Sequence, residues 1–195
     1  MTDEKERSQR RIITVSKRNL TSICLLLAFV LLPQRGRAED YPIPAHGALQ
    51  IVFPKGWKIS SRSLAQPPTL ALAVTPEDSM ILNVQITTVW LDAAALEQAT
   101  AERRRGDMEK SGREMLSQAV EKTLAIQELR GAQSNGFYYA LTDRAPGPGE
   151  HKYLIQGSLL TGPALSVFTI LYRSPGMEEV NQVLKALSTA AYSAR

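Results

Sequence analysis

The chain has 195 residues and a formal net charge of +4, but its positive charge is concentrated at the N-terminus. Residues 1–38 hold eight Lys and Arg against three Asp and Glu, so the remainder carries 15 basic and 16 acidic residues and a net charge of about −1. Such a balance argues against a nucleic-acid-binding surface, which needs basic residues to neutralise phosphates. The single cysteine, Cys24, leaves no disulfide, thiolate metal ligand or cysteine nucleophile for the later residues.

Residues 1–38 have the pattern of a cleaved signal peptide. A basic region is followed by the apolar run 23–32 and by the small residues Gly36 and Ala38, the order typical of an export signal. The run is about half of the roughly 20 apolar residues that span a membrane, so no transmembrane segment is expected after cleavage at Ala38. We therefore expect a periplasmic or secreted protein. Sec export is favoured, and the Arg10-Arg11 pair leaves twin-arginine export open.

Residues 39–48 contain two prolines and no hydrophobic period, which predicts an extended lead-in. Order is expected to begin near Leu49, in a single domain of residues 49–195. This length is close to the usual size of one domain with one core.

Short segments with two-residue alternation or many β-branched residues, separated by turn residues, predict a sheet. Residues 49–53 and 57–59 are expected to form an edge hairpin or a bent strand. Residues 60–68 are expected to form a loop. Gly, Pro and Asn between the last three segments favour an antiparallel meander. The predicted strands are 49–53, 57–59, 69–74, 80–90, 115–120, 124–129, 137–142, 152–160 and 164–172.

Two helices are predicted. Asp92 is suited to cap the first, which covers residues 93–110 and has Gly112 as its expected stop. The second is a C-terminal helix whose apolar residues recur at helical spacing. The sequence thus predicts an α+β domain, an antiparallel sheet of about six or seven strands with one long helix and a C-terminal helix packed on it.

The segment Phe53-Pro54-Lys55-Gly56-Trp57 and the order of elements from Leu49 to the end resemble the PsbP/Mog1-like superfamily. The resemblance implies the fold. Members of the superfamily include photosystem accessory subunits, small-GTPase partners and bacterial envelope proteins, so it implies no particular activity. The exported chain is most similar to the bacterial envelope members, and no family site residue transfers to it.

His46 and His151 are the only histidines, and they lie in a proline-rich segment and beside a Gly-Pro loop. Neither has the spacing of a metal motif, and no serine lies in a Gly-x-Ser-x-Gly turn, so no metal, cofactor or catalytic residue is assigned. We favour the interpretation that both are solvated loop histidines without a functional role. The run Arg103-Arg104-Arg105 is interpreted as a solvated helix face because acidic residues surround it.

Aromatic residues supply most of the amphipathic surface of the chain. We name Tyr138, Tyr139, Tyr153 and His151 as candidates for binding a ligand or partner. Alternation should place the adjacent tyrosines 138 and 139 on opposite faces of the sheet, at least one of them in the core. Trp57 is expected to close one end of the core.

Three functions fit these patterns. The first is an exported envelope accessory or binding protein without catalytic activity, which has another envelope protein as its partner. The second is a hydrolase or other enzyme whose site is assembled from distant residues around His151. The third is a structural protein that docks a membrane assembly through an exposed sheet face. No ligand or oligomeric state follows from the sequence.

Overall fold

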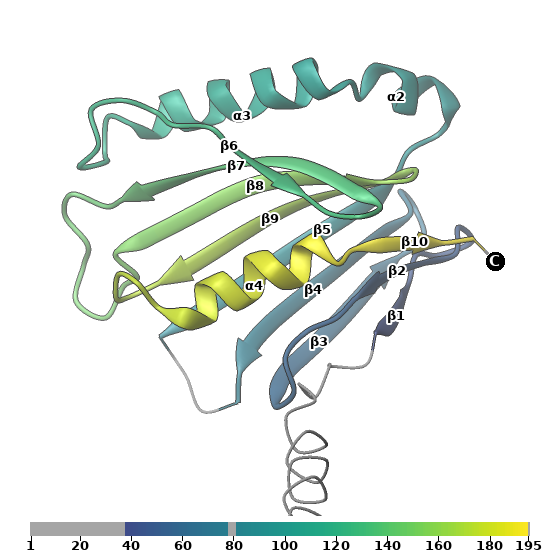
Figure 1. Cartoon of the computed structure of the whole chain (residues 1–195), viewed down its shortest axis with the longest axis horizontal. Coiled ribbons are helices and arrows are strands. Elements are labelled where there is room, and N and C mark those ends of the chain that lie inside the picture. Colours follow the sequence, from purple (N-terminus) through teal and green to yellow (C-terminus); the bar gives the residue numbers. More distant parts are fainter. Residues whose placement is uncertain (1–37, 78–80, 195) are drawn as a thin grey trace, which may run out of the picture. The chain divides into compact units, whose positions relative to one another are not determined.

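Seven antiparallel strands form the main sheet of the computed structural model, which describes residues 38–77 and 81–194 (Figure 1). The predicted α+β class and antiparallel sheet are confirmed, including the meander of the last three strands. In sheet order the strands are β3 (Trp57–Leu64), β4 (Thr69–Pro76), β5 (Leu82–Trp90), β9 (Ala164–Tyr172), β8 (Tyr153–Thr161), β7 (Ser134–Thr142) and β6 (Gln127–Arg130).

A second sheet joins both ends of the described chain, in the order β1 (Glu39–Pro42), β2 (Ala48–Ile51) and β10 (Ala191–Ser193). Order therefore does not begin near Leu49, because the predicted lead-in contains β1 and buries Tyr41 and Ile43 in the core. The expected edge hairpin is also wrong. β2 pairs with β1 and β10, whereas β3 pairs with β4.

The helices are α2 (Ala93–Gln98), α3 (Ala101–Met115) and α4 (Glu178–Ser188). The predicted cap is present, since the Asp92 side chain accepts a hydrogen bond of 2.8 Å from the Ala95 N–H. Thr100 makes a second cap, which divides the predicted long helix in two. The expected stop at Gly112 is wrong because α3 continues to Met115.

Two strand predictions after α3 also need correction. Residues 115–120 form the last residue of α3 and a turn, with one isolated bridge between Ala119 and Asp143. The strand predicted at 124–129 is shorter and begins at Gln127. Residues 60–68 do not form a loop throughout, because β3 extends to Leu64 and pairs with β4 in register.

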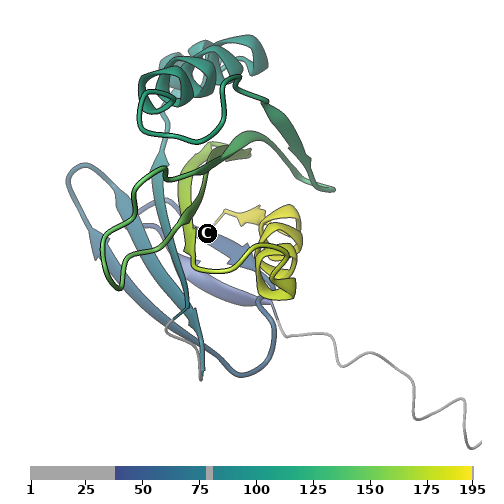
Figure 2. The same cartoon turned by 90° about the vertical axis from the view of Figure 1, so that its left-hand side faces the viewer.

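The two longer helices pack on opposite faces of the main sheet (Figures 1 and 2). The main core lies between the sheet, α4 and the small sheet, and includes the fully buried Phe168. A smaller core lies under α3 and includes Met108 and Tyr139. Alternation along the strands supplies both cores, as in β4, whose residues Leu70, Leu72 and Val74 face the main core.

Within the described ranges, none of the helices is long and apolar enough to cross a membrane. The predicted signal peptide at residues 1–38 falls almost entirely outside the part of the chain that the structure describes.

Candidate functional site

A cavity of about 190 Å³ lies where α3 ends and where β7, β8 and β9 meet the turn around Asp143 and His151. These ends of the helix and strands are at the left of Figure 1. We call it the His151 pocket. Its apolar wall is formed by Met115, Ala119, Leu141, Leu154 and Leu171.

The strand register explains the apolar wall. Leu141 of β7 lies opposite Leu154 of β8, which lies opposite Leu171 of β9. Residues at matched positions of neighbouring antiparallel strands share a face, so three leucines form one row across the sheet. Met115, the last residue of α3 and 37% exposed, stands at the edge of this row.

His151 lines the pocket and carries an unusual polar atom. Its Nε2 is buried and has no hydrogen-bond partner among the described residues. Leaving a buried donor or acceptor unpaired costs about 1–3 kcal/mol, so this atom is an unsatisfied polar group in the wall around the pocket.

The neighbouring polar groups, in contrast, have partners. Glu121 accepts hydrogen bonds from the backbone N–H of Thr142 at 2.8 Å and from its hydroxyl at 2.7 Å. Asp143 Oδ1 accepts from the Ala145 N–H at 2.9 Å. Lys152 Nζ lies 5.8 Å from the centre of the Tyr153 ring, a cation–π contact.

Local charge effects follow from this arrangement. Partial burial raises the pKa of Glu121, but two hydrogen bonds from Thr142 and one from the Glu121 backbone together outweigh it, so the pKa is lowered overall. Tyr172 stacks on Tyr153 with ring centres 5.1 Å apart. Burial, followed by the effects of Tyr153 and Glu121, raises the pKa of Tyr172.

The structure brings two of the four candidate residues together, since both His151 and Tyr153 line the pocket. The other two lie elsewhere on opposite faces of β7. Tyr139 is fully buried under α3 and donates a 2.6 Å hydrogen bond to Gln156. Tyr138 is half-buried against the main core and donates to Gln127 at 2.7 Å.

The second histidine is far from the pocket. His46 stacks on Trp90, with ring centres 3.8 Å apart and planes 12° apart. Trp90 is the last residue of β5. Leu82, at the other end of this strand, pairs with Tyr172 near the pocket. The nine residues of β5 are joined by eight steps of 3.3–3.4 Å, so about 27 Å separates its two ends. In the described ranges no three metal-binding side chains cluster.

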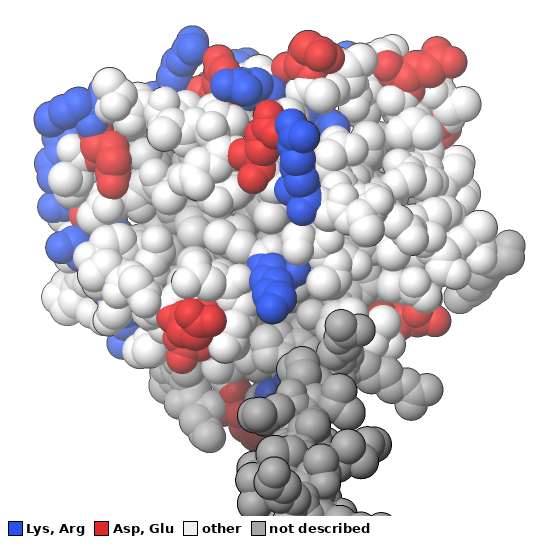
Figure 3. All heavy atoms as spheres, viewed as in Figure 1, with Lys and Arg blue, Asp and Glu red and all other residues white. Residues whose placement is uncertain are grey.

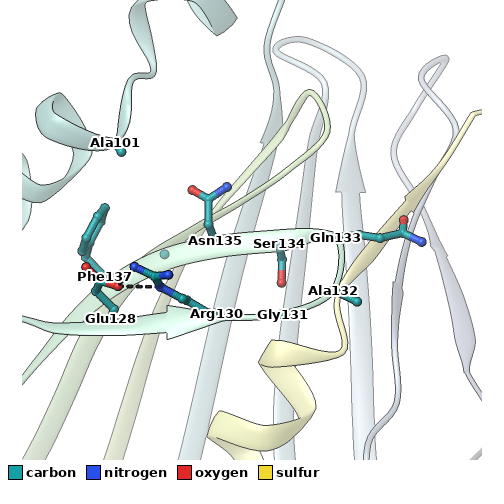
Figure 4. A pocket seen from close by; sticks show the side chains of 10 residues that line it. Ala101, Glu128, Arg130, Gly131, Ala132, Gln133, Ser134, Asn135 and Phe137 are labelled. Atoms are coloured by element: carbon teal, nitrogen blue, oxygen red, sulfur yellow. Dashed lines mark hydrogen bonds and ion pairs between the residues drawn. The ribbon is translucent and has the colours of Figure 1, made fainter.

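A larger cavity of about 490 Å³ lies between the β6–β7 hairpin and Ala101 (Figure 4). Its wall is more polar than that of the His151 pocket, and most of its lining residues are exposed. Arg130 and Glu128, two residues apart on β6, both line it and form an ion pair with a 2.6 Å hydrogen bond. Ser134 Oγ is buried without a partner in the described chain, but Figure 4 shows this side chain pointing to the side of the hairpin opposite Asn135. We favour the His151 pocket, because its lining is more apolar and includes a histidine whose Nε2 has no partner in the described chain.

The arginine cluster departs from the solvated helix face that was expected. Arg104 is only 5% exposed, and it donates hydrogen bonds to the carbonyls of Ala99 and Asn135. It also lies over the Phe137 ring, 5.7 Å from its centre. Arg104 thus ties α3 to β7, while Arg103 and Arg105 are exposed.

Charges of both signs are mixed on the molecular face seen in Figure 3, with many of them along the edge where α3 runs. Along α3, Glu109 pairs with Arg105 at 3.4 Å and with Arg113 at 3.2 Å. These exposed pairs leave little unbalanced charge on the helix.

Sequence reasoning missed most of the pocket wall. Its three leucines were assigned correctly to strands, but the register that aligns them was not predicted. Met115 was placed in a strand, and its position at the end of α3 depends on the helix passing Gly112. Testing the possible pairing registers of the strands in the meander could have aligned the three leucines.

No protein-family model matches the chain, and no curated protein matches it. Among solved structures, it is similar to cyanobacterial PsbP (CyanoP) from Synechocystis sp. PCC 6803, with 10% identity and a TM-score of 0.48. That match covers 74% of this chain and 86% of the other.

A second similar structure comes from Bacteroides thetaiotaomicron VPI-5482, with 11% identity and a TM-score of 0.45. It covers 83% of this chain, which spans about half (49%) of the other. Both TM-scores are below 0.5, so these likenesses carry no argument about function. The likeness to Mog1 and to exported envelope proteins stays a prediction.

Proposed function

We propose that this chain is an exported binding protein of the cell envelope, without catalytic activity, and that the His151 pocket is its ligand site. The observation that supports the proposal is the buried, unpartnered Nε2 of His151 beside a wall of apolar side chains. Ligand sites combine an apolar lining with a few polar groups that orient the ligand. The ligand is a small molecule or a side chain of an envelope partner.

The pocket chemistry favours binding over catalysis. Nucleophilic catalysis needs a nucleophile activated by a neighbouring base. The Thr142 hydroxyl at the pocket donates to Glu121, and the Tyr153 ring is stacked on Tyr172. Neither contact links a hydroxyl to the imidazole of His151.

An apolar probe tests this function. Toluene added to the full-length chain should shift the methyl NMR signals of Leu141, Leu154 and Leu171, which line the pocket. Leu154→Phe fills the cavity and should abolish the shifts, and Met115→Trp provides a second filled variant if the first fails to fold. Unchanged methyl signals in folded wild-type protein at saturating toluene would overturn the proposed site.

The hydrolase hypothesis keeps one supporting observation, because His151 and Asp143 line the same pocket. Turnover of p-nitrophenyl acetate separates it from binding. A rate above the uncatalysed reaction that His151→Leu abolishes and His46→Leu retains would support the enzyme. Equal rates in all three proteins are expected for a binding protein.

A further inference from the structure

Strand β3 forms one edge of the main sheet and, in the described part of the chain, has β4 as its only neighbouring strand. It pairs with β4 over all eight of its residues, whereas β6 at the opposite edge has only four residues. An edge strand presents backbone N–H and C=O groups that a further strand can pair with. Because β4 and β5 separate β3 from the strands of the His151 pocket, this edge is a different surface.

The hydrogen-bond pattern identifies the groups of β3 that face the free edge. The Trp90 N–H donates to the Pro68 carbonyl at 3.3 Å, next to the pair of Thr69 with Val89. Alternate residues of an antiparallel strand bond to opposite neighbours, so even-numbered residues of β4 bond to β5 and odd-numbered ones bond to β3. The odd-numbered residues of β4 are paired with even-numbered residues of β3. The backbone groups of the odd-numbered residues of β3 therefore point away from the sheet.

These outward groups belong to Ile59, Ser61 and Ser63 in the body of the strand, and they have no backbone partner within the described ranges. The strand is also open on both sides here. All five residues from Ser60 to Leu64 are exposed, although their side chains alternate between the two faces. The edge thus offers a row of unpaired donors and acceptors that another strand can reach.

The charge of this edge restricts which strand it accepts. Lys58 and Arg62 are exposed and lie on the face of the sheet opposite the main core, since they pair with Thr75 and Ala71. Strands β3, β4 and β5 contain no Asp or Glu. All ion pairs among the described residues lie on α3 and β6. The edge therefore carries two positive charges without an acidic partner there.

A second copy of β3 fits this edge poorly. Antiparallel pairing of two copies about a two-fold axis perpendicular to the sheet keeps equivalent faces on the same side, so four basic side chains would gather on one face. Like charges on neighbouring strands are destabilising, and basic residues on edge strands are a common protection against self-pairing. An acidic strand reverses the sign of this effect. The same two charges thus exclude a second copy and favour an acidic partner.

We infer that the free edge of β3 binds an extended acidic segment of another protein, which adds to the main sheet as a further strand. The backbone groups of Ile59, Ser61 and Ser63 supply the hydrogen bonds. Lys58 and Arg62 select acidic side chains four positions apart, because residues directly across an antiparallel pair share a face. Strand addition draws its affinity from main-chain hydrogen bonds and its specificity from alternate side chains. This surface goes beyond the proposed function and does not depend on it.

The probe is a heptapeptide of threonine and valine with glutamate at its second and sixth positions, acetylated and amidated at its ends. Its binding to the full-length chain should slow amide hydrogen exchange at Ile59, Ser61 and Ser63, measured by NMR. Exchange at Ser60 and Arg62, which already pair with β4, should change little. A peptide with glutamine in place of both glutamates should bind about twofold to thirtyfold more weakly, the effect of losing two exposed ion pairs.

Two substitutions of Ser61 test the backbone contribution. Ser61→Pro removes an outward N–H, and proline is tolerated on an edge strand where that group faces away from the sheet. This variant should fold and should no longer bind the glutamate peptide. Ser61→Ala keeps the N–H and should bind as the wild type does.

Charge reversal provides a second test that leaves the backbone of β3 unchanged if the proline variant fails to fold. The double variant Lys58→Glu with Arg62→Glu should bind the glutamine peptide more tightly than the glutamate peptide. Lys110→Glu with Lys185→Glu is the matched control, because it changes the net charge equally at exposed positions on α3 and α4. This control should keep the wild-type preference.

Three outcomes would overturn the inference. Unchanged amide exchange at Ile59 and Ser61 with millimolar glutamate peptide, or undiminished binding to folded Ser61→Pro, would exclude strand addition at this edge. Equal affinities of the wild type for the two peptides would exclude an acidic segment. We expect a monomer in sedimentation, and a dimer that Ser61→Pro abolishes would identify a second copy as the occupant. Each result leaves the toluene test of the His151 pocket unaffected.

Discussion

Two glycines of α3 have different surroundings, although the same helix holds both. A Cβ added at Gly106 would have no atom within 4 Å, whereas at Gly112 it would lie 2.6 Å from a methyl carbon of Leu124. Gly112 therefore permits close packing of Leu124, and that contact explains why the helix passes a residue predicted to stop it.

We predict opposite effects of alanine at these positions. Gly106→Ala should stabilise the protein by about 1 kcal/mol, the difference in helix propensity, and should raise the melting temperature by about 2–4 °C. Gly112→Ala should lose this gain because Leu124 must move, and should melt below the Gly106 variant. Equal melting temperatures of the two variants in thermal denaturation would contradict the packing argument.

Trp57 lies differently from the core position expected from its sequence. It is half-buried and packs on the edge of the main core, while Phe168 is fully buried. We predict that Trp57→Ala lowers the free energy of unfolding by about 2 kcal/mol and that Phe168→Ala lowers it by about 3–5 kcal/mol. Urea denaturation of the two variants compares them directly. Equal losses would show that Trp57 contributes as much as a residue at the centre of the core.

At the scale of elements, the positions of the strands were easier to predict than the pairing between them. Local alternation located β4, β5, β7, β8 and β9, since each has a buried face with a two-residue period. The end of α3 was missed because a distant contact with Leu124 outweighs the local propensity of Gly112. The leucine row of the pocket was missed for a related reason, because register depends on pairing between strands.

Hydrogen bonds from Thr142 to Glu121 connect the segment between α3 and β6 to β7. Because the pKa of Glu121 is lowered, the stability that these bonds contribute depends on pH. A lowered folded pKa contributes stability above the unfolded value, about 4.3, and loses it as pH falls through the folded pKa. We predict that Thr142→Val is less stable than wild type at pH 7 and that the difference narrows toward pH 3.

Chemical denaturation at several pH values measures this difference. Thr87→Val serves as the control, because Thr87 is exposed on β5 and the same chemical change there should give an effect independent of pH. If the difference in free energy of unfolding between wild type and Thr142→Val stays constant from pH 7 to pH 3, Glu121 does not stabilise the segment.

At the scale of the whole molecule, the class and the main sheet followed from the sequence, but the small sheet did not. Leu49 pairs with both Tyr41 and Tyr192, and no local pattern links positions about 140 residues apart. Residues 39–42 also looked unstructured because two prolines lie close by, yet Pro42 is tolerated at the end of edge strand β1.

The predicted cleavage site can be tested against this sheet. Cleavage after Ala38 leaves β1 complete, because Glu39 is its first residue. We predict that N-terminal sequencing of exported protein begins at Glu39 and that Ala38→Arg blocks processing, since a small residue is required there. Mature protein that begins beyond Ile43 would contradict this, because it would lack β1 and a fully buried core residue.

The pairing of β2 with β10 also sets the order in which the fold can be completed. Contacts between residues far apart in sequence form slowly, because a long loop must close first. A chain that crosses a membrane with its N-terminus first delivers β2 early and β10 last. Under the Sec export that we propose, the small sheet would close only after translocation of the final residues, so the topology would delay complete folding until the whole domain has crossed.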